Sequence, residues 1–258
     1  MRIAPKLSRV ENVVAEVSGV LLNGRLRGYE ASGLAQRIRF LRETHFGKCG
    51  ARVLNGLAEH SKAAGSVAEI TPRLRKGLEW LVSYLPAAPA RQLQAWSNEA
   101  PVLVFTDGAN EPEAVTVGAV LLERGAPPEY FGARVPDELV KKWQQAGGHQ
   151  VIGQAELLPV QVAAMVWQAR IAGIFSIWFL DQDAARRGLI RGYSPSARSS
   201  DIIEDAAEML ASAETYPWFA RVVTGSNVAD GPSRMDFSLM ESFPGSRRRC
   251  FDWGPWVQ

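Results

Sequence analysis

The stretch from residue 101 to residue 110 combines an unbroken apolar run with a carboxylate at its end. Residues 102–105 are β-branched, aliphatic or aromatic, which predicts a buried strand. The run stops at Asp107-Gly108, where the chain needs a turn or a bulge. A carboxylate at the end of a rigid central strand is well placed to hold a metal ion. An ordinary Asp-Gly turn would give the same local pattern, so the rest of the chain has to decide.

Residues 101–240 alternate between strand and helix patterns. Further strands are predicted at 116–122, with Gly118 as a bulge, and at 130–135, 175–180 and 218–223. Helices are predicted at 137–145, 154–170, 183–191 and 199–213, with Pro159 in the opening turns of the second. The first three strands are close enough for an antiparallel meander, and the later strands alternate with helices. We therefore expect an α/β fold, a mixed five-stranded sheet flanked by helices.

Residues 1–95 have a different pattern, with apolar residues at helical spacing and glycines between the runs. The Pro-Ala-Ala-Pro segment at 86–89 is expected to end this helical part. The predicted organisation is a small helical, basic segment at 1–95, an α/β domain at 96–240 and a C-terminal tail at 241–258. In that tail Arg247, Arg248 and Arg249 are expected to form a solvated charge run, with phosphate contact as the alternative.

Charge is distributed unevenly along the chain. Residues 1–100 contain 15 Lys/Arg and 8 Asp/Glu, whereas residues 101–258 contain the remaining 14 and 19. A basic part can attract a polyanion, while the acidic part concentrates carboxylates. Arginines on a solvated helical face would explain the first imbalance equally well. The candidate nucleic-acid-binding residues are Arg37, Arg39, Arg42 and Lys48 in the basic part and Arg198 in a polar loop.

Other classes of protein are disfavoured by what the chain lacks. No apolar run approaches the ~18 residues that span a membrane. The two cysteines, Cys49 and Cys250, show no paired spacing, so neither a disulfide framework nor a zinc site is indicated. An intracellular, reducing compartment is the expectation that follows.

Four acidic residues occupy ordered positions in the predicted α/β domain. Asp107 and Asp181 end the first and fourth strands, Glu156 opens the long helix, and Asp230 follows the fifth strand. Neighbouring strands lie ~5 Å apart, so carboxylates at two adjacent strand ends can share metal ions. Clustered carboxylates repel one another unless cations neutralise them. Oxygen ligands favour Mg²⁺ or Mn²⁺, and two ions ~3.5–4 Å apart can assist phosphodiester hydrolysis.

The segments around these residues resemble the four acidic motifs of ribonuclease H domains in retroelement reverse transcriptases, DIRS-like retrotransposons among them. The matching segments, over roughly residues 100–240, are Thr106-Asp-Gly-Ala, Gln154-Ala-Glu-Leu-Leu, Phe179-Leu-Asp-Gln-Asp-Ala-Ala-Arg and Asn227-Val-Ala-Asp-Gly-Pro-Ser-Arg. The resemblance implies a ribonuclease H-like fold, hydrolysis of the RNA strand of RNA–DNA hybrids, and two Mg²⁺ or Mn²⁺ ions. It implies Asp107 and Asp181 as ligands shared by both ions, Glu156 as a ligand of the first and Asp230 of the second.

The basic part is similar to the thumb-to-connection region of the same polymerases, through residues 33–42 and Phe46-Gly47. The chain lacks the aspartate pair of a polymerase palm, so polymerisation is not expected. Gln182 stands where these enzymes usually have asparagine. The loop at 223–230 lacks the histidine that many ribonucleases H carry, and His149 is a weak alternative as general base.

Two rival interpretations remain open at this point. One is another nuclease of this fold, such as an exonuclease or a strand-transfer enzyme. Exonucleases of the fold typically carry a glutamate two residues after the first aspartate, where this chain has Ala109. The other is a retroelement remnant that binds nucleic acid or protein without catalysis. Four acidic residues favour an enzyme, but a recently inactivated remnant would keep them too.

Overall fold

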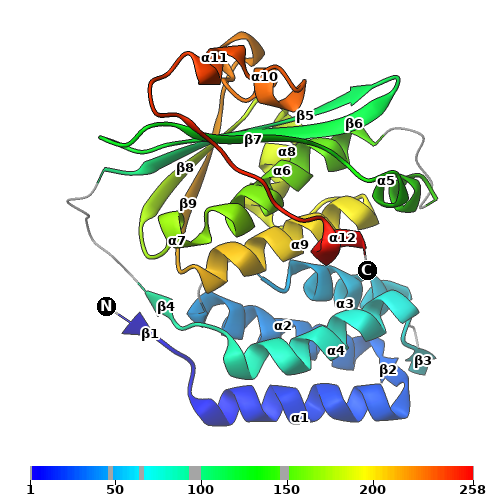
Figure 1. Cartoon of the computed structure of the whole chain (residues 1–258). Helices are drawn as coiled ribbons and strands as arrows, with labels where there is room; N and C mark the ends of the chain where they lie inside the picture. The colour runs from blue at the N-terminus through cyan, green and yellow to red at the C-terminus, as the bar shows by residue number, and fades with distance from the viewer. Residues whose placement is uncertain (1, 46–48, 64–66, 93–99, 146–150, 258) are drawn as a thin grey trace. The chain divides into compact units, whose positions relative to one another are not determined.

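The computed structural model describes residues 2–45, 49–63, 67–92, 100–145 and 151–257 (Figure 1). The chain divides into two compact units, Met1–Ala95 and Trp96–Gln258. Within the described ranges, every helix is too short or too polar to cross a membrane.

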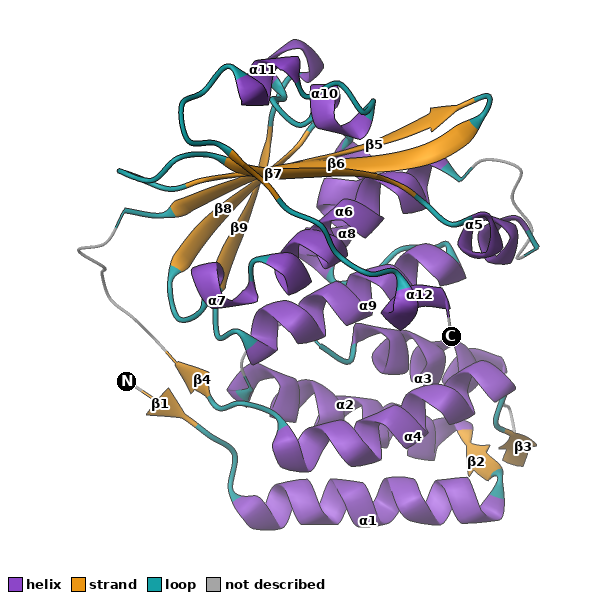
Figure 2. Cartoon of the chain, in the orientation of Figure 1, coloured by secondary structure: helices purple, strands orange, loops and turns teal. Residues whose placement is uncertain are grey.

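Unit 1 is mainly helical, as its apolar spacing predicts (Figure 2). Its core consists almost entirely of aliphatic side chains, such as Val17, Leu34, Leu57 and Leu78, from four helices. These helices are α1 (Leu7–Asn23), α2 (Gly28–Thr44), α3 (Ala51–Ala63) and α4 (Pro72–Ala87).

Local signals set the ends of these helices. α1 stops at Gly24, whose positive φ of 66° lets its N–H reach the Val20 carbonyl oxygen. α4 starts after Thr71, whose hydroxyl accepts the Leu74 N–H at 3.2 Å, with Pro72 in the first turn. Pro86 lies inside α4, so the helix continues one residue past the first proline of the predicted stop.

Two small antiparallel sheets in unit 1 were not predicted, because two- and three-residue strands leave no period-2 pattern. One pairs β1 (Arg2–Ile3) with β4 (Arg91–Gln92), and the other pairs β2 (Arg25–Arg27) with β3 (Val67–Glu69). They join segments that lie far apart in the sequence.

Unit 2 contains one mixed sheet with the strand order β10-β7-β6-β5-β8-β9. β5, β6 and β7 form an antiparallel meander, and β5, β8 and β9 are parallel neighbours. The predicted mixed sheet flanked by helices is confirmed, with a two-residue sixth strand added at its edge. The strands are β5 (Val102–Glu111), β6 (Ala114–Leu122), β7 (Glu129–Arg134), β8 (Phe175–Leu180), β9 (Tyr216–Arg221) and β10 (Arg247–Arg248).

Helices cover the two faces of this sheet unequally. The larger core lies between one face and the long helices α6 and α9, where Val104, Val117 and Trp178 are buried. A smaller core on the other face contains Val120 and Ala229, under the short helices α10 and α11 (Figure 1). The helices of the unit are α5 (Asp137–Gln144), α6 (Ile152–Val166), α7 (Gln168–Ile171), α8 (Asp183–Arg191), α9 (Ala197–Ser212), α10 (Asp230–Ser233), α11 (Ser238–Glu241) and α12 (Gly254–Val257), with a 3-10 turn at Thr224–Ser226.

Several local predictions for this unit were wrong. The predicted turn or bulge at Asp107-Gly108 is absent, because β5 continues through it in regular register to Glu111. Gly118 is not a bulge, because it pairs in regular register with Asp107 on one side and Gly132 on the other. Pro159 is the eighth residue of α6 rather than part of its opening turns, since the helix begins at Ile152. The long predicted helix is also divided at Trp167, between α6 and α7.

The C-terminal residues pack onto the rest of unit 2, while Arg247, Arg248 and Arg249 are exposed, as the predicted charge run requires. Arg249 donates two hydrogen bonds of 2.8 Å to the carboxylate of Glu129, which is 2% exposed. Phe251 packs edge-on against Phe131, with ring centroids 5.2 Å apart. A buried carboxylate and a buried ring therefore hold the segment, and the charge pattern alone could not reveal either partner.

Candidate functional site

Asp107 and Asp181 come from two adjacent parallel strands, but Asp107 lies inside β5, which continues to Glu111, rather than at the predicted strand end. β5 pairs with β8 up to Phe105 opposite Phe179, and each aspartate follows two residues later. Side chains two residues apart in a strand share a face, so Asp107 lies on the same face of the sheet as Phe105. Asp181 comes directly after the last residue of β8. The parallel register thus brings both carboxylates to the point where the pairing of β5 with β8 stops.

Glu156 reaches the same place from α6 because Gly108 lets this helix approach the strand. A Cβ at Gly108 would lie 2.1 Å from the Ala155 carbonyl oxygen and 2.8 Å from the Glu156 nitrogen. Any larger residue would push the helix away. Pro159 lacks an N–H and cannot form the usual helical bond to Ala155, whose carbonyl faces this glycine.

A second close approach positions α10 on the opposite face of the sheet. A Cβ at Gly118 would lie 2.2 Å from the Ser233 nitrogen, and one at Gly132 would lie 2.2 Å from the Pro232 oxygen. These glycines and Asp107 form one row across β5, β6 and β7. The backbone of α10 therefore rests directly on the strands beside Asp107.

The structure brings Asp107, Glu156 and Asp181 together. One carboxylate oxygen of each lies within 4.8 Å of the corresponding oxygens of the other two. Asp107 is 5% exposed and Glu156 is 7% exposed. Among the described residues, the buried oxygens Glu156 Oε2 and Asp181 Oδ1 have no hydrogen-bond partner. Two acceptor atoms are therefore enclosed without a donor, an arrangement that normally costs stability.

Burial and mutual repulsion disfavour the charged forms of these groups. Burial raises the pKa of Asp107 to about 6, and the charges of Asp181 and Asp230 act in the same direction. A hydrogen bond from Ser233 and the charge of Arg234 oppose this shift. Burial, with the charges of Asp107 and Asp181, raises the pKa of Glu156 to about 8, against a hydrogen bond from the Gly108 backbone.

Asp230 lies beside this group rather than within it. It opens α10 and is close enough to influence Asp107, but it is not one of the three residues whose oxygens converge. Arg234 holds its carboxylate, with Nε 3.1 Å from Asp230 Oδ1, and also pairs with Glu111 at 2.5 Å. Of the four predicted acidic residues, three converge and the fourth is adjacent and paired with an arginine.

The donor set fits a hard divalent cation. It consists only of carboxylate oxygens, which Mg²⁺ and Mn²⁺ prefer, and two of those oxygens lack protein partners. Burial first, and then the neighbouring carboxylates, raise the pKa values of Asp107 and Glu156, and the charge of Arg234 offsets this only in part at Asp107. A cation would relieve both the repulsion and the missing hydrogen bonds.

The sequence interpretation quoted the segment at 227–234 but gave a role only to Asp230. The structure assigns contacts to three of its neighbours. Asn227 is 5% exposed, and its Nδ2 donates to the Thr106 carbonyl oxygen at 3.1 Å. Ser233 donates to Asp107, and Arg234 holds Asp230. Asn227 directly precedes Val228-Ala229, and a polar residue beside apolar ones could have indicated a buried hydrogen bond. The sequence gave no such indication for Ser233, because its partner Asp107 is 126 residues away.

The predicted nucleic-acid-binding residues lie in varied settings. Arg37 forms an ion pair with Glu16, while Arg39 is exposed and donates to Gln36 Oε1 at 3.3 Å. Arg198 is 46% exposed and lies 4.0 Å from Asp201. Lys48 and the candidate base His149 lie outside the described residues.

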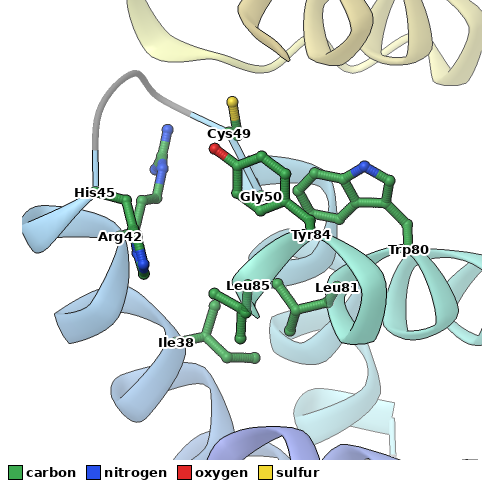
Figure 3. A pocket seen from close by; sticks show the side chains of 9 residues that line it. All are labelled: Ile38, Arg42, His45, Cys49, Gly50, Trp80, Leu81, Tyr84 and Leu85. Atoms are coloured by element: carbon green, nitrogen blue, oxygen red, sulfur yellow. The ribbon is translucent and has the colours of Figure 1, made fainter. Parts of the chain in front are cut away.

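Arg42 lines a small hollow in unit 1 (Figure 3). The stacked rings of Trp80 and Tyr84, 4.6 Å apart, come from α4. The hollow contains no carboxylate, so it offers none of the ligands of the acidic cluster. Its lining consists of Ile38, Arg42, His45, Cys49, Gly50, Trp80, Leu81, Tyr84 and Leu85.

Three solved structures that resemble part of the chain are ribonucleases H or ribonuclease H domains. Ribonuclease H1 from Halobacterium salinarum NRC-1 is 16% identical, with a TM-score of 0.42 over 55% of this chain and 100% of its own. The N-terminal ribonuclease H domain of a Mycobacterium tuberculosis protein is 13% identical, with a TM-score of 0.40 over 55% and 96%. LC11-RNase H1, solved in complex with RNA/DNA hybrid, is 13% identical, with a TM-score of 0.43 over 55% and 99%. The sequence matches no protein-family model and no curated protein.

Proposed function

We propose that the chain is a metal-dependent endonuclease of the ribonuclease H type, which hydrolyses the RNA strand of RNA–DNA hybrids. The observation that carries this proposal is the convergence of Asp107, Glu156 and Asp181, with two buried oxygens that no group among the described residues satisfies. A module that only bound nucleic acid would gain nothing from such a cluster, because it repels phosphate.

Asp107, Glu156 and Asp181 would hold the divalent cations, Mg²⁺ or Mn²⁺, with Asp230 adjacent. Bound ions of this kind generate a nucleophile from water and stabilise the charge of a phosphodiester. The residues of the chain supply the fixed geometry. Gly108 sets the distance between Glu156 and the strand, and α10 brings Asp230 beside Asp107.

The sequence motifs supply the context of the proposal. Their resemblance to retroelement reverse transcriptases supports an origin in, or a role within, such an enzyme. Substrate selection by helix shape and 2′-hydroxyl groups, rather than by base sequence, is the expected mode for a hybrid. A hollow beside α8, which begins two residues after Asp181, has Arg187 and Arg191 in its wall together with Asp183, which pairs with Arg187. We propose Arg191 as its contact to backbone phosphate.

The deciding experiment compares labelled RNA–DNA hybrid, duplex DNA, duplex RNA and single-stranded RNA, each with and without Mg²⁺. We expect internal cleavage of the RNA strand of the hybrid only, and only with the cation. Cleavage of the DNA strand, or trimming from an end, would favour another nuclease of the fold. No cleavage of any substrate would favour a binding module.

The basic residues of unit 1 are proposed to contact phosphate, and the salt dependence of binding tests this. Replacing Arg39 by glutamine should reduce the slope of log affinity against log salt by about one unit if it makes one phosphate contact. Lys76→Gln is a matched control, since Lys76 is an exposed cation of the same unit outside the predicted set. Equal slopes for both variants would mean that Arg39 is exposed to solvent and makes no phosphate contact.

A further inference from the structure

Ser233 is the last residue of α10, and its side chain is fully enclosed, with 0% exposure. Its hydroxyl donates to Asp107 Oδ2 across 2.5 Å. It also lies 2.8 Å from the Asp230 carbonyl oxygen. We propose that Ser233 is a positioning residue of the metal site, which orients the Asp107 carboxylate and fastens α10 to β5.

This inference rests on the proposed metal site and deepens it. A carboxylate that binds a cation must present an oxygen in a fixed direction, and a hydrogen bond to its second oxygen provides that restraint. The remaining protein contacts of the cluster give little such help, since Glu156 Oε2 and Asp181 Oδ1 have no protein donor. The Ser233 hydroxyl is thus the side-chain donor that the structure shows on Asp107.

The packing around Ser233 explains why a short hydroxyl side chain can do this. Gly118 and Gly132 let the α10 backbone rest on the sheet, 2.2 Å from where their Cβ atoms would be. At that separation a serine reaches the neighbouring strand without displacing the helix. A longer polar side chain at the same position would have to move α10 outward, and Asp230 with it.

The same contact couples two carboxylates from distant parts of the chain. Asp230 begins the four-residue helix that Ser233 ends, while Asp107 belongs to β5, 126 residues before Ser233. Loss of the hydroxyl should therefore loosen the orientation of Asp107 and the seat of α10 together. The expected consequence is weaker binding of the cation.

The test measures Mn²⁺ affinity by electron paramagnetic resonance titration of the full chain and its variants. Ser233→Ala should bind Mn²⁺ about 10- to 100-fold more weakly, the usual cost of losing an outer partner of a metal ligand. The Mg²⁺ concentration for half-maximal hybrid cleavage should rise in parallel. Ser233→Cys, which keeps the shape of the side chain with a slightly larger atom but donates weakly, should change both in the same direction and decides the question if the alanine variant does not fold.

Ser176→Ala is the matched control. Ser176 is 1% exposed and bonds the Trp178 indole N–H at 2.9 Å, so its loss also removes a buried hydroxyl, but at the far end of β8. It should leave Mn²⁺ affinity unchanged. Ser233 variants that match Ser176→Ala in affinity would overturn the inference.

Failure of the inference can be told apart from failure of the proposed function. A wild-type chain that binds Mn²⁺ but cleaves nothing would refute the nuclease, while the affinities would still test Ser233. A wild-type chain that cleaves hybrid, with Ser233→Ala unchanged in both measurements, would refute the positioning role alone. A wild-type chain that binds no Mn²⁺ would refute both.

Discussion

Glu129 and Glu156 are both buried carboxylates of unit 2, but one is surrounded by arginines and the other by carboxylates. Glu129 accepts hydrogen bonds from Trp167, Arg170 and Arg249, and its bonds and ion pairs lower its pKa, the Arg249 bond most. Burial raises the pKa of Glu156, and the charges of its acidic neighbours Asp107 and Asp181 raise it further. The protein therefore neutralises the first charge itself, whereas the second cluster is the one proposed to take a cation from solution.

The largest expected effect separates the two clusters by activity. Asp181→Asn should reduce hybrid cleavage by more than about 100-fold, because it removes a proposed ligand rather than an outer partner. The fold should be kept or even stabilised, since repulsion within the cluster falls. Asp137→Asn is the control, a 66%-exposed aspartate at the start of α5. Cleavage by Asp181→Asn at the wild-type rate would refute the proposed site.

The second effect is a pH dependence of stability that the two clusters should show with opposite signs. Asp107 and Glu156 have raised pKa values in the folded chain, about 6 and about 8 against ordinary values of 3.8 and 4.5. The stabilisation of the folded chain by their protonated forms is therefore fully present below pH ~4 and is lost as the pH rises to ~8. The free energy of unfolding falls by up to about 1.4 kcal/mol per pH unit for each group. Glu129, with a lowered pKa, contributes above its ordinary value of 4.5 and loses its contribution only in acid.

Urea unfolding between pH 5 and pH 8.5 in a chelator would measure this dependence. Stability should fall across the range, and Asp107→Asn should flatten the decline. Saturating Mg²⁺ should restore stability most at the alkaline end, where the carboxylates are charged. A stability that rises with pH in the chelator would contradict the raised pKa values of Asp107 and Glu156.

The residues that the sequence interpretation placed well share a local signature. Asp107 and Asp181 follow apolar runs, and Glu156 lies in a helical pattern, as the fifth residue of α6, so nearby residues alone located them. Glu129 had no such signature, because its cationic partners Arg170 and Arg249 are 41 and 120 residues away. Whether a charged side chain is buried depends on its partners in the folded structure, and a single sequence does not show which distant residues those are.

The glycines show the same limit. Gly118 was expected to bulge because glycine weakens a strand, but its lack of a Cβ serves to seat α10. The sequence shows that glycine has no side chain, but it does not show which backbone segment occupies the space. Helix propensity predicts Pro159 near a helix start. It is accepted inside α6 because the Ala155 carbonyl, which would accept its missing N–H, faces Gly108.

The third effect tests the neutralised cluster. Glu129→Gln should destabilise unit 2 by about 3 kcal/mol, at the low end for breaking a buried ion pair, because both arginines reach solvent. The side chains of Arg170 and Arg249 are 33% and 42% exposed. Mn²⁺ affinity should not change. Urea titration and the same resonance measurement would check both, and a change in affinity would contradict the separation of the clusters.

The smallest effect isolates burial as the cause of the difference. Glu123 pairs with the same Arg170 as Glu129 does, but the side chain of Glu123 is 39% exposed, whereas that of Glu129 is 3% exposed. An exposed pair contributes ~0.2–1 kcal/mol and is screened by salt. Glu123→Gln should therefore destabilise unit 2 by less than about 1 kcal/mol, and 0.5 M salt should remove most of that difference. The loss from Glu129→Gln should persist at the same salt concentration, because salt screens a buried pair much less. Equal losses for the two variants would mean that Arg170, rather than burial of Glu129, determines the strength of this cluster.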